Sequence, residues 1–263
     1  MKKYELLETD TIDNMKRIRA LRSFGNVAKG DLGGYIENET NLSHNDICWV
    51  LDNAQVYGNA QVLDNALVSG NAWVFGDAQV YDNVRVYDNV RVSGNALVSG
   101  DAQVCGNARV YDNARVFGNA RVSGNAWVYG DAQVYGNVRV YDNVRVSGNA
   151  LVSGDAQVSG NVRVYDDARV FGNAQVYNDA WVYGDAQVFG NMKVTQNVLY
   201  MFLTRDNMTA SDSHIAIGCE LHTIQHWLEH YREIGKENDY TEDEISFYGW
   251  AIYILAKRRG IIE

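Results

Sequence analysis

A six-residue repeat decides the fold of this chain: it begins at Ala54-Gln55-Val56-Tyr57-Gly58-Asn59 and ends at Met192-Lys193-Val194-Thr195-Gln196-Asn197. The phrase A/V-x-V-x-G/D-N/D recurs twenty-four times over residues 54–197 without an insertion. A short, fixed period is typical of a solenoid, in which each unit buries its apolar face only by stacking on its neighbours.

Each repeat combines a short strand with a tight turn. Ala54 and Val56 lie on one face of the strand, and Gln55 lies on the other. The pair Gly58-Asn59 tolerates left-handed backbone, and Asp accepts the same turn through its own side-chain hydrogen bonds. The chain contains no proline, which suits strands that both donate and accept hydrogen bonds. We therefore expect three strands per coil to close a tube filled by valine and alanine, with coils about 4.8 Å apart.

The repeat resembles that of the hexapeptide-repeat proteins, whose fold is a left-handed parallel β-helix with three hexads per coil. The resemblance implies an all-β solenoid of about eight regular coils, roughly 38 Å long at the usual spacing between strands. One difference is visible. The family places glycine directly after the interior aliphatic residue, whereas Tyr, Phe or Ser usually fills that position here.

The same register extends towards the N-terminus. Cys48, Leu42 and Ile36 fall in the alanine position. Val50, His44, Asn38 and Leu32 fall in the valine position. We therefore expect residues 30–53 to form an irregular first coil, which places the β-helix at 30–197. Residues 4–7 and 17–21 predict a hairpin, so that residues 1–29 cover the unpaired strand edges of that coil.

Residues 24–35, 42–43 and 48–50 are similar to the opening of a group of enterobacterial and prophage-associated hexapeptide-repeat proteins. Members of that group are labelled acyltransferases, largely on the basis of their fold. The resemblance implies a phage or prophage source, and it raises acyl transfer as an alternative function.

The hexad stops at residue 198, and residues 198–263 predict a small α+β domain that covers the other end. Strands are expected at 199–207 and 214–219. A helix is expected to begin at Thr223 and to stop at Gly235. A capping box from Thr241 to Glu244 predicts a last helix that reaches about Arg259.

The composition of the chain limits the classes of partner that we expect it to bind. The formal net charge is −10, but residues 54–197 contain thirteen acidic and ten basic residues, which is a poor imitation of DNA. No basic stripe predicts nucleic-acid binding. No signal peptide or membrane-spanning run is recognisable, and three cysteines form no disulfide framework. We expect a cytoplasmic protein without a membrane partner.

Histidines are placed unfavourably for catalysis or metal binding. Acyltransferases of the resembled family use a histidine base, and the zinc enzymes that share the fold use three coil histidines, but residues 54–197 contain none. His226 and His230 lie one helical turn apart near His222 and Cys219, which is a zinc-like spacing. Because the core face of that helix carries Trp227, we expect the histidines on the solvated side. We predict no catalytic residue, no metal site and no cofactor.

The outward-facing strand residues, taken at every eighteenth position, form one patterned face. This column contains Gln55, Trp73, Arg91, Arg109, Trp127, Arg145, Arg163 and Trp181. The tryptophans recur in every third coil, and Leu97 and Leu151 recur at the same interval, which indicates duplication in units of three coils. Two interpretations stay open: recent copying in which arginine covers tryptophan, and a binding face rich in the residues that interfaces favour.

Aromatic residues after the interior valine form further columns at the corners. One runs Tyr57, Phe75, Ser93, Tyr111, Tyr129, Ser147, Tyr165, Tyr183; another runs Leu63, Tyr81, Ser99, Phe117, Tyr135, Ser153, Phe171, Phe189. Stacking of this kind usually serves stability. It also allows a nucleotide or another small signalling molecule to stack, which is a third functional alternative.

The sequence thus predicts a non-catalytic interaction scaffold that self-associates as a dimer or trimer. Its predicted binding residues for a protein partner are Trp73, Arg91, Arg109, Trp127, Arg145, Arg163 and Trp181.

Overall fold

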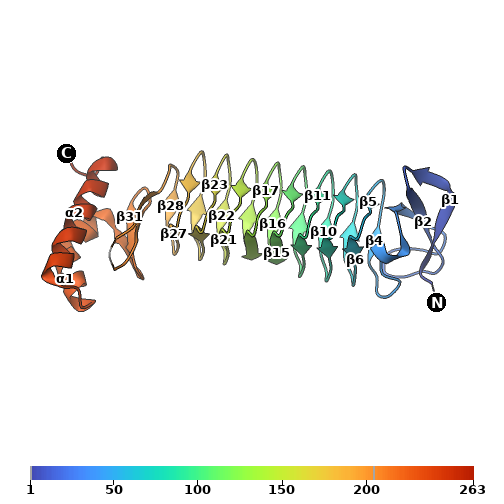
Figure 1. Cartoon of the computed structure of the whole chain (residues 1–263), viewed down its shortest axis with the longest axis horizontal. Helices are drawn as coiled ribbons and strands as arrows, with labels where there is room; N and C mark the ends of the chain where they lie inside the picture. The colour runs from blue at the N-terminus through green and yellow to red at the C-terminus, as the bar shows by residue number, and fades with distance from the viewer. Residues whose placement is uncertain (1, 204) are drawn as a thin grey trace.

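The computed structural model describes residues 2–203 and 205–263 and shows a straight three-sided β-solenoid of about nine turns, with a cap at each end (Figure 1). Three sheets of eleven, nine and eight strands form its sides. Successive coils pair in parallel at an offset of three hexads, as in Gln55 with Trp73 and Trp73 with Arg91. The predicted fold class is confirmed, and so is the predicted coil of three hexads.

The strands of each sheet are short. The first sheet contains β1 (Tyr4–Ile12), β2 (Met15–Ala20), β3 (Leu32–Ile36), β5 (Gln55–Val56), β8 (Trp73–Val74), β11 (Arg91–Val92), β14 (Arg109–Val110), β17 (Trp127–Val128), β20 (Arg145–Val146), β23 (Arg163–Val164) and β26 (Trp181–Val182). The second contains β6 (Gln61–Val62), β9 (Gln79–Val80), β12 (Leu97–Val98), β15 (Arg115–Gly118), β18 (Gln133–Gly136), β21 (Leu151–Val152), β24 (Arg169–Val170) and β27 (Gln187–Val188). The third contains β4 (Trp49–Val50), β7 (Leu67–Val68), β10 (Arg85–Val86), β13 (Gln103–Val104), β16 (Arg121–Val122), β19 (Arg139–Val140), β22 (Gln157–Val158), β25 (Gln175–Val176) and β28 (Lys193–Val194).

The interior of the tube is apolar and closed to solvent. The alanine and valine positions of the regular hexads are fully buried, from Ala54 and Val56 to Val194. Backbone amides bond one coil to the next, as in Trp73 N–H to the carbonyl of Val90 at 2.9 Å. The two faces of each strand therefore separate a buried core from an outer surface that is free to vary.

The corners explain the choice between glycine and aspartate. The fifth hexad position has positive φ, for example 68° at Gly58 and 62° at Asp82. Asp82 uses its carboxylate to accept the Gly100 N–H of the next coil at 2.8 Å. The sequence predicts that aspartate bonds within its own turn, whereas at these positions the hydrogen bond links neighbouring coils. At the sixth position, asparagine amides form ladders from coil to coil, as in Asn59 Nδ2 to Asp77 Oδ1 at 2.8 Å.

The first coil corrects the predicted register. Ile36 pairs with Val56 and Leu42 with Val62, an offset two residues longer than in the regular coils, and only Trp49 and Val50 return to the regular offset. The two extra residues lie in the loop between Leu42 and Cys48. Ile36 and Leu42 are therefore buried at valine positions instead of the predicted alanine positions.

The residues predicted at the valine positions of this coil mostly lie elsewhere. Leu32 is 49% exposed, His44 lies in the loop, and Asn38 precedes the 3-10 helix η1 (Glu39–Asn41). Gly34 lies beside Ala54, where an added Cβ would come within 2.5 Å of the Ala54 carbonyl oxygen. Cys48 does occupy an alanine position and is fully buried.

The N-terminal cap is the antiparallel hairpin β1–β2, which pairs with β3. Its first residues seal the end of the tube. Tyr4 Oη donates to the Leu42 carbonyl at 2.8 Å, and Lys3 Nζ donates to the Cys48 carbonyl at 2.8 Å. The His44 ring stacks on Tyr4 at 4.2 Å, and its Nδ1 accepts the Lys3 N–H at 3.2 Å.

This contact makes the cap sensitive to acid. Burial lowers the pKa of His44 below its ordinary value of 6.5, against the opposing charge of Glu39 and together with the like charges of Lys2 and Lys3. As the pH falls below 6.5, the unfolded state binds a proton that the folded state resists, so the stability of the cap decreases. Protonation also removes the acceptor for the Lys3 amide. We expect amide exchange in β1 and β2, corrected for intrinsic rates, to accelerate relative to β17 between pH 7 and about pH 5.

The control for this expectation is His44→Asn, which keeps a side-chain acceptor and removes the titration. In that variant the ratio of exchange rates in β1 and β2 to those in β17 should be independent of pH over the same range. An equal pH response in both proteins would contradict the assignment to His44.

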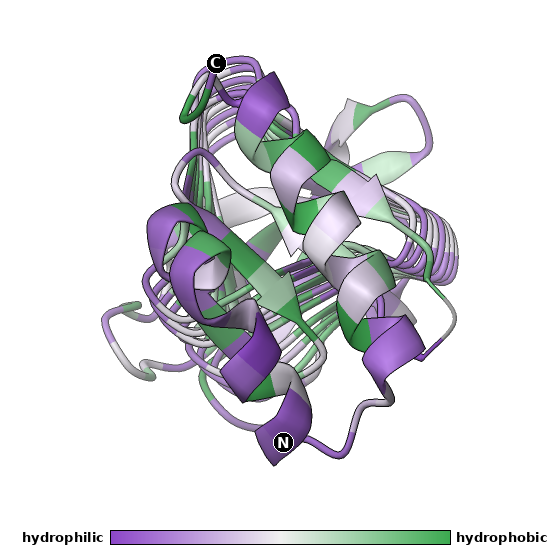
Figure 2. Cartoon of the chain, turned by 90° about the vertical axis from the view of Figure 1, so that its left-hand side faces the viewer, coloured by the Kyte–Doolittle hydropathy of each residue, from purple (hydrophilic) through white to green (hydrophobic). Residues whose placement is uncertain are grey.

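The C-terminal cap is an antiparallel sheet of four strands with two helices across its outer side (Figure 2). Its elements are β29 (Leu199–Met201), β30 (Met208–Ala210), β31 (His214–Ile217), β32 (Glu220–Thr223), α1 (Ile224–Glu237) and α2 (Glu242–Arg258). Side chains close the edges of the last coil. Asn197 Oδ1, Thr209 Oγ1 and Asp212 Oδ2 accept the N–H groups of Trp181, Gln187 and Thr195 at 3.0, 3.0 and 2.8 Å.

Two details of this cap differ from the prediction, and one agrees. Four strands are present where two were predicted. Gly235 does not stop the first helix, because α1 continues to Glu237. A Cβ at Gly235 would lie 2.7 Å from Ile245 Cγ1, so this glycine allows close packing of α1 on α2. The capping box of Thr241 and Glu244 is present as predicted.

Candidate functional site

The Trp–Arg column, which comprises Trp73, Arg91, Arg109, Trp127, Arg145, Arg163 and Trp181, lies on the outer face of the first sheet. Parallel pairing places these residues side by side in consecutive coils. The period of the sequence predicted this arrangement, and the structure brings all seven residues together in the predicted order.

Each arginine of the column stacks on a tryptophan. The guanidinium carbon lies 4.7 Å from the ring for Arg91 on Trp73 and 4.8 Å for Arg163 on Trp181. Arg109 and Arg145 approach Trp127 from opposite sides, each at 4.9 Å. Trp73 and Trp127 are consequently half-buried, and Trp181 is 38% exposed. The column therefore combines flat apolar surface with cationic groups fixed in position.

The four arginines keep their charge available to a ligand. Within residues 2–203 and 205–263, no salt bridge engages Arg91, Arg109, Arg145 or Arg163. Acids at the adjoining corner are engaged in turn contacts: Asp112 Oδ2 accepts Gly130 N–H at 3.2 Å, and Asp131 Oδ1 accepts from Asn113 at 3.0 Å. The four arginines are exposed, and none of them is paired with a carboxylate in the part of the chain that the structure describes.

The corner column beside the first sheet adds aromatic rings. Tyr57 stacks on Phe75 at 5.0 Å and Tyr111 on Tyr129 at 4.9 Å, with rings within 2° of parallel. Burial raises the pKa of Tyr111, as it does for Tyr165, so that the phenols stay neutral near neutral pH. The rings therefore bring no negative charge to the arginines.

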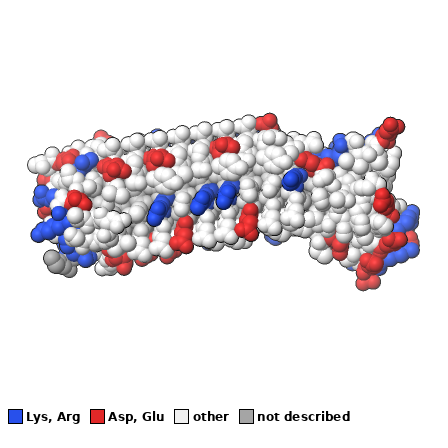
Figure 3. Space-filling view, turned by 180° about the vertical axis from the view of Figure 1, so that it is seen from behind, with Lys and Arg blue, Asp and Glu red and all other residues white. Residues whose placement is uncertain are grey.

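Charge is also sparse on one further face of the solenoid. On the face that Figure 3 shows, basic side chains lie in one broken row along the axis, flanked by acidic side chains, and mixed charge gathers at the ends. On this face the basic side chains are spaced singly and form no continuous track.

The five histidines lie outside the regular coils, one in the loop of the first coil and four in the C-terminal cap. His44 packs on Tyr4, and His214 begins β31, where burial lowers its pKa. The rings of His222, His226 and His230 form a stack with spacings of 4.6 and 4.5 Å. They are half-buried instead of fully solvated, and His222 and His230 contact Glu220 and Glu233. Within the part of the chain that the structure describes, no group of three His, Cys, Asp or Glu side chains is arranged to hold a metal ion.

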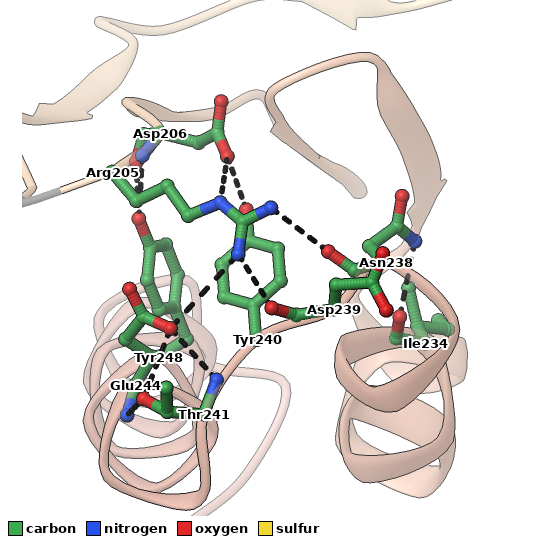
Figure 4. Close-up of polar contacts among 9 residues, drawn as sticks. All are labelled: Arg205, Asp206, Ile234, Asn238, Asp239, Tyr240, Thr241, Glu244 and Tyr248. Carbon is green, nitrogen blue, oxygen red and sulfur yellow. Dashed lines mark hydrogen bonds and ion pairs between the residues drawn. The ribbon is translucent and has the colours of Figure 1, made fainter.

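A polar cluster in the C-terminal cap was not predicted (Figure 4). Arg205 donates to the carbonyls of Asp239 at 2.8 Å and Asn238 at 3.0 Å, and its guanidinium lies 4.3 Å from the Tyr240 ring. Tyr240 donates to the Asp206 carboxylate, and burial raises the pKa of this phenol. Because the arginine binds the carbonyls at the end of α1, the cluster fixes the connection between α1 and α2.

This cluster lies at the rim of a small pocket of about 100 Å³ between the two helices and β31. The pocket has apolar walls that include Ile217, Trp227 and Ile252. Since the charged groups at its rim already bind each other, the arrangement serves the packing of the cap. It was invisible in the sequence, because its partners are separated by 33 to 42 residues.

An aromatic face on α2 was also not predicted. Phe247, Trp250 and Tyr253 are 43%, 56% and 45% exposed, three residues apart on the side away from the cap core. Within residues 2–203 and 205–263, no helix is long and apolar enough to cross a membrane.

On this geometry the chain is a β-solenoid protein with two closed ends. A model of the bactofilin family, described as polymer-forming cytoskeletal, matches residues 94–193, and a model of the YdcK β-solenoid repeat matches residues 78–93. A similar solved structure is the UDP-N-acetylglucosamine acyltransferase of Francisella novicida. It has a TM-score of 0.43 and 15% identity over 80% of this chain and 76% of that chain. The curated proteins give no match.

Proposed function

We propose that the protein is a non-catalytic interaction scaffold that binds a protein partner, and associates with its own copies, through the Trp–Arg column. The observation that carries this proposal is the set of four arginines that stack on tryptophans and have no acidic partner within the described residues. Interfaces favour tryptophan and arginine, and fixed side chains lose less entropy on binding.

The closed ends direct association to the sides of the rod. Within the described residues, the hairpin β1–β2 pairs with β3, and side chains of the C-terminal cap bond to the last coil, so one rod does not continue another by direct stacking of coil on coil. The match of residues 94–193 to a polymer-forming cytoskeletal family supports contact between copies. The similarity of residues 24–35, 42–43 and 48–50 to a prophage-associated group supports a phage or prophage source.

The test is the double variant Trp127→Ser and Trp181→Ser. It removes two flat anchors and releases three stacked arginines, so partner binding should weaken by about 2 kcal/mol or more, and any oligomer should dissociate. Sedimentation and affinity purification from the native host measure the two effects. The matched control is Leu97→Ser with Leu151→Ser, which changes two outward residues three coils apart on the second sheet.

Two results would overturn the proposal. One is unchanged assembly and unchanged partner recovery in the tryptophan variant. The other is saturable release of coenzyme A from acetyl-CoA with an amine or sugar acceptor, which would establish the acyltransferase alternative instead. Saturable binding of a nucleotide in calorimetry, in the absence of any protein partner, would favour the third alternative.

A further inference from the structure

Two slots interrupt the aromatic column at the corner of the first sheet. The column runs Tyr57, Phe75, Ser93, Tyr111, Tyr129, Ser147, Tyr165 and Tyr183. Its rings stack in three pairs, with the last pair, Tyr165 and Tyr183, at 5.8 Å. Ser93 separates the first pair from the second, and Ser147 separates the second pair from the third. Each serine thus leaves a gap of one missing ring.

The arginines of the Trp–Arg column lie beside the same gaps, and neighbouring arginines turn in opposite directions along the axis. Arg145 turns to Trp127 and Arg163 turns to Trp181, so the two guanidinium groups lean away from each other. Arg91 and Arg109 diverge in the same way, towards Trp73 and Trp127. Ser147 is two residues after Arg145, and Ser93 is two residues after Arg91. Both gaps therefore lie beside a pair of separated positive charges.

At Ser147 the gap is a pocket of about 400 Å³. Tyr129 and Tyr165 form its two ends, Arg145 and Arg163 line one side, and Trp181 and Asp166 complete it. The Asp166 carboxylate accepts the Gly184 N–H at 3.3 Å. The arginines are exposed, so the slot is shallow and open, as interface pockets are, in contrast to the enclosed sites of small ligands.

The slot dimensions suit one planar ring. Tyr129 and Tyr165 belong to coils two apart, about 9.6 Å at the usual spacing between strands. A ring placed midway would lie about 4.8 Å from each, which is close to the 4.9 Å between Tyr111 and Tyr129. The neighbouring guanidinium groups favour a carboxylate beside that ring.

The distance between the two slots indicates which backbone conformation a partner needs in order to reach both. Ser93 and Ser147 are three coils apart, which corresponds to about 14 Å along the axis. An extended strand covers this distance in about four residues, and residues four apart lie on the same face of a strand. One segment can therefore place an aromatic side chain in each slot.

We infer that the two slots bind an extended acidic segment of the partner protein, with aromatic side chains about four residues apart and carboxylates beside them. This inference rests on the proposed interaction function and specifies the chemistry of its partner. The two serine gaps recur at the interval of the three-coil duplication, and each lies beside an equivalent pair of arginines.

The test fills each slot with tyrosine, which neighbouring coils already contain at the same hexad position. Ser93→Tyr and Ser147→Tyr extend the existing stacks, and the fold should tolerate them. The matched control is Ser99→Phe, which fills the gap between Tyr81 and Phe117 in the second corner column, beside Leu97 instead of arginine. The probes are a labelled peptide with two tryptophans four residues apart, each followed two residues later by glutamate so that both side chains share one face of the strand, and the same peptide with one tryptophan.

We expect the two-tryptophan peptide to bind the unaltered protein more tightly than the one-tryptophan peptide. Ser147→Tyr alone should lower the affinity for the two-tryptophan peptide roughly tenfold or more, to that of the one-tryptophan peptide. The double variant Ser93→Tyr with Ser147→Tyr should remove binding. Ser99→Phe should leave the affinity unchanged. Added salt should weaken binding, since carboxylate–arginine contacts at an exposed site are screened.

Equal affinity of the two-tryptophan peptide for the unaltered protein and for the double variant Ser93→Tyr with Ser147→Tyr would overturn the inference. So would binding of adenosine monophosphate at both slots without binding of either peptide. If Trp127→Ser with Trp181→Ser abolishes partner binding but the filled slots do not, the slot inference falls and the proposed function stands.

Discussion

Val116→Asp is expected to prevent the middle of the solenoid from folding. Val116 on β15 is fully buried, between Val98 and Val134 of the adjoining coils. The tube interior is lined by buried alanine and valine side chains, which offer a carboxylate no hydrogen bond, so burial of the charge or of the protonated acid costs about 4 kcal/mol or more. The net stability of a protein domain is only about 5–15 kcal/mol. Loss of this coil also removes the template for both of its neighbours.

Circular dichroism during thermal unfolding, together with proteolysis, measures this effect. The control is Arg115→Asp, one position earlier on the same strand, where the side chain is exposed. The Arg115 variant should melt within a few degrees of the unaltered protein. A Val116 variant with an equally unchanged melting temperature would show that the valine face does not line an apolar core.

Gly124→Val is expected to destabilise the solenoid by about 3 kcal/mol. Gly124 has a φ of 70°, where a β-branched residue is strained. An added Cβ would also lie 2.7 Å from the backbone nitrogen and 2.9 Å from the Cα of Asp142 in the next coil. Both contacts are with backbone that is held in the stack, so the neighbour has little room to move.

Gly124→Asp separates the requirement for left-handed backbone from a simple lack of space. Asp64 and Asp82 already follow each other at this position in adjoining coils, and the Asp64 carboxylate accepts the Asp82 N–H at 3.1 Å. The aspartate variant should therefore lose much less stability than the valine variant. Urea unfolding of the two proteins compares them, and equal losses would contradict the role of the backbone conformation.

Much of the fold followed from sequence because the interior of a regular coil is decided by local pattern. The buried alanine and valine, the offset of three hexads between coils and the capping box at Thr241 all depend on residues close in sequence. The first coil was misplaced by two residues because Leu42 and Cys48 are both apolar, and either spacing buries them. Only contacts with the following coil distinguish the two registers.

The C-terminal cap was less predictable for a physical reason. β30 (Met208–Ala210) and β32 (Glu220–Thr223) are three and four residues long, too short to show an alternating pattern. Gly235 follows an apolar period and fits a helix stop, but its role depends on Ile245 in the second helix. Packing between helices overrides local preference in such cases.

For the candidate site, the period of the sequence predicted which residues form the Trp–Arg column, but it did not predict which ring each arginine contacts. The order of Trp73, Arg91, Arg109 and Trp127 follows from the period. The direction in which each arginine turns depends on competition between neighbouring rings, which the period does not encode. Arg205 and its partners were missed because helix and loop contacts far apart in sequence assemble them.

The hydrogen bonds that join the two caps to the solenoid, within the described residues, reach its terminal coils, so the rod between them can be regarded as a spacer (Figure 1). Its length can change in steps of one coil without altering either cap. A change of three coils, the interval from Trp73 to Trp127, would also preserve the alternation of tryptophan and arginine along the first sheet. Gene duplication or deletion in this unit would therefore lengthen or shorten the reach of the molecule while retaining its surface chemistry.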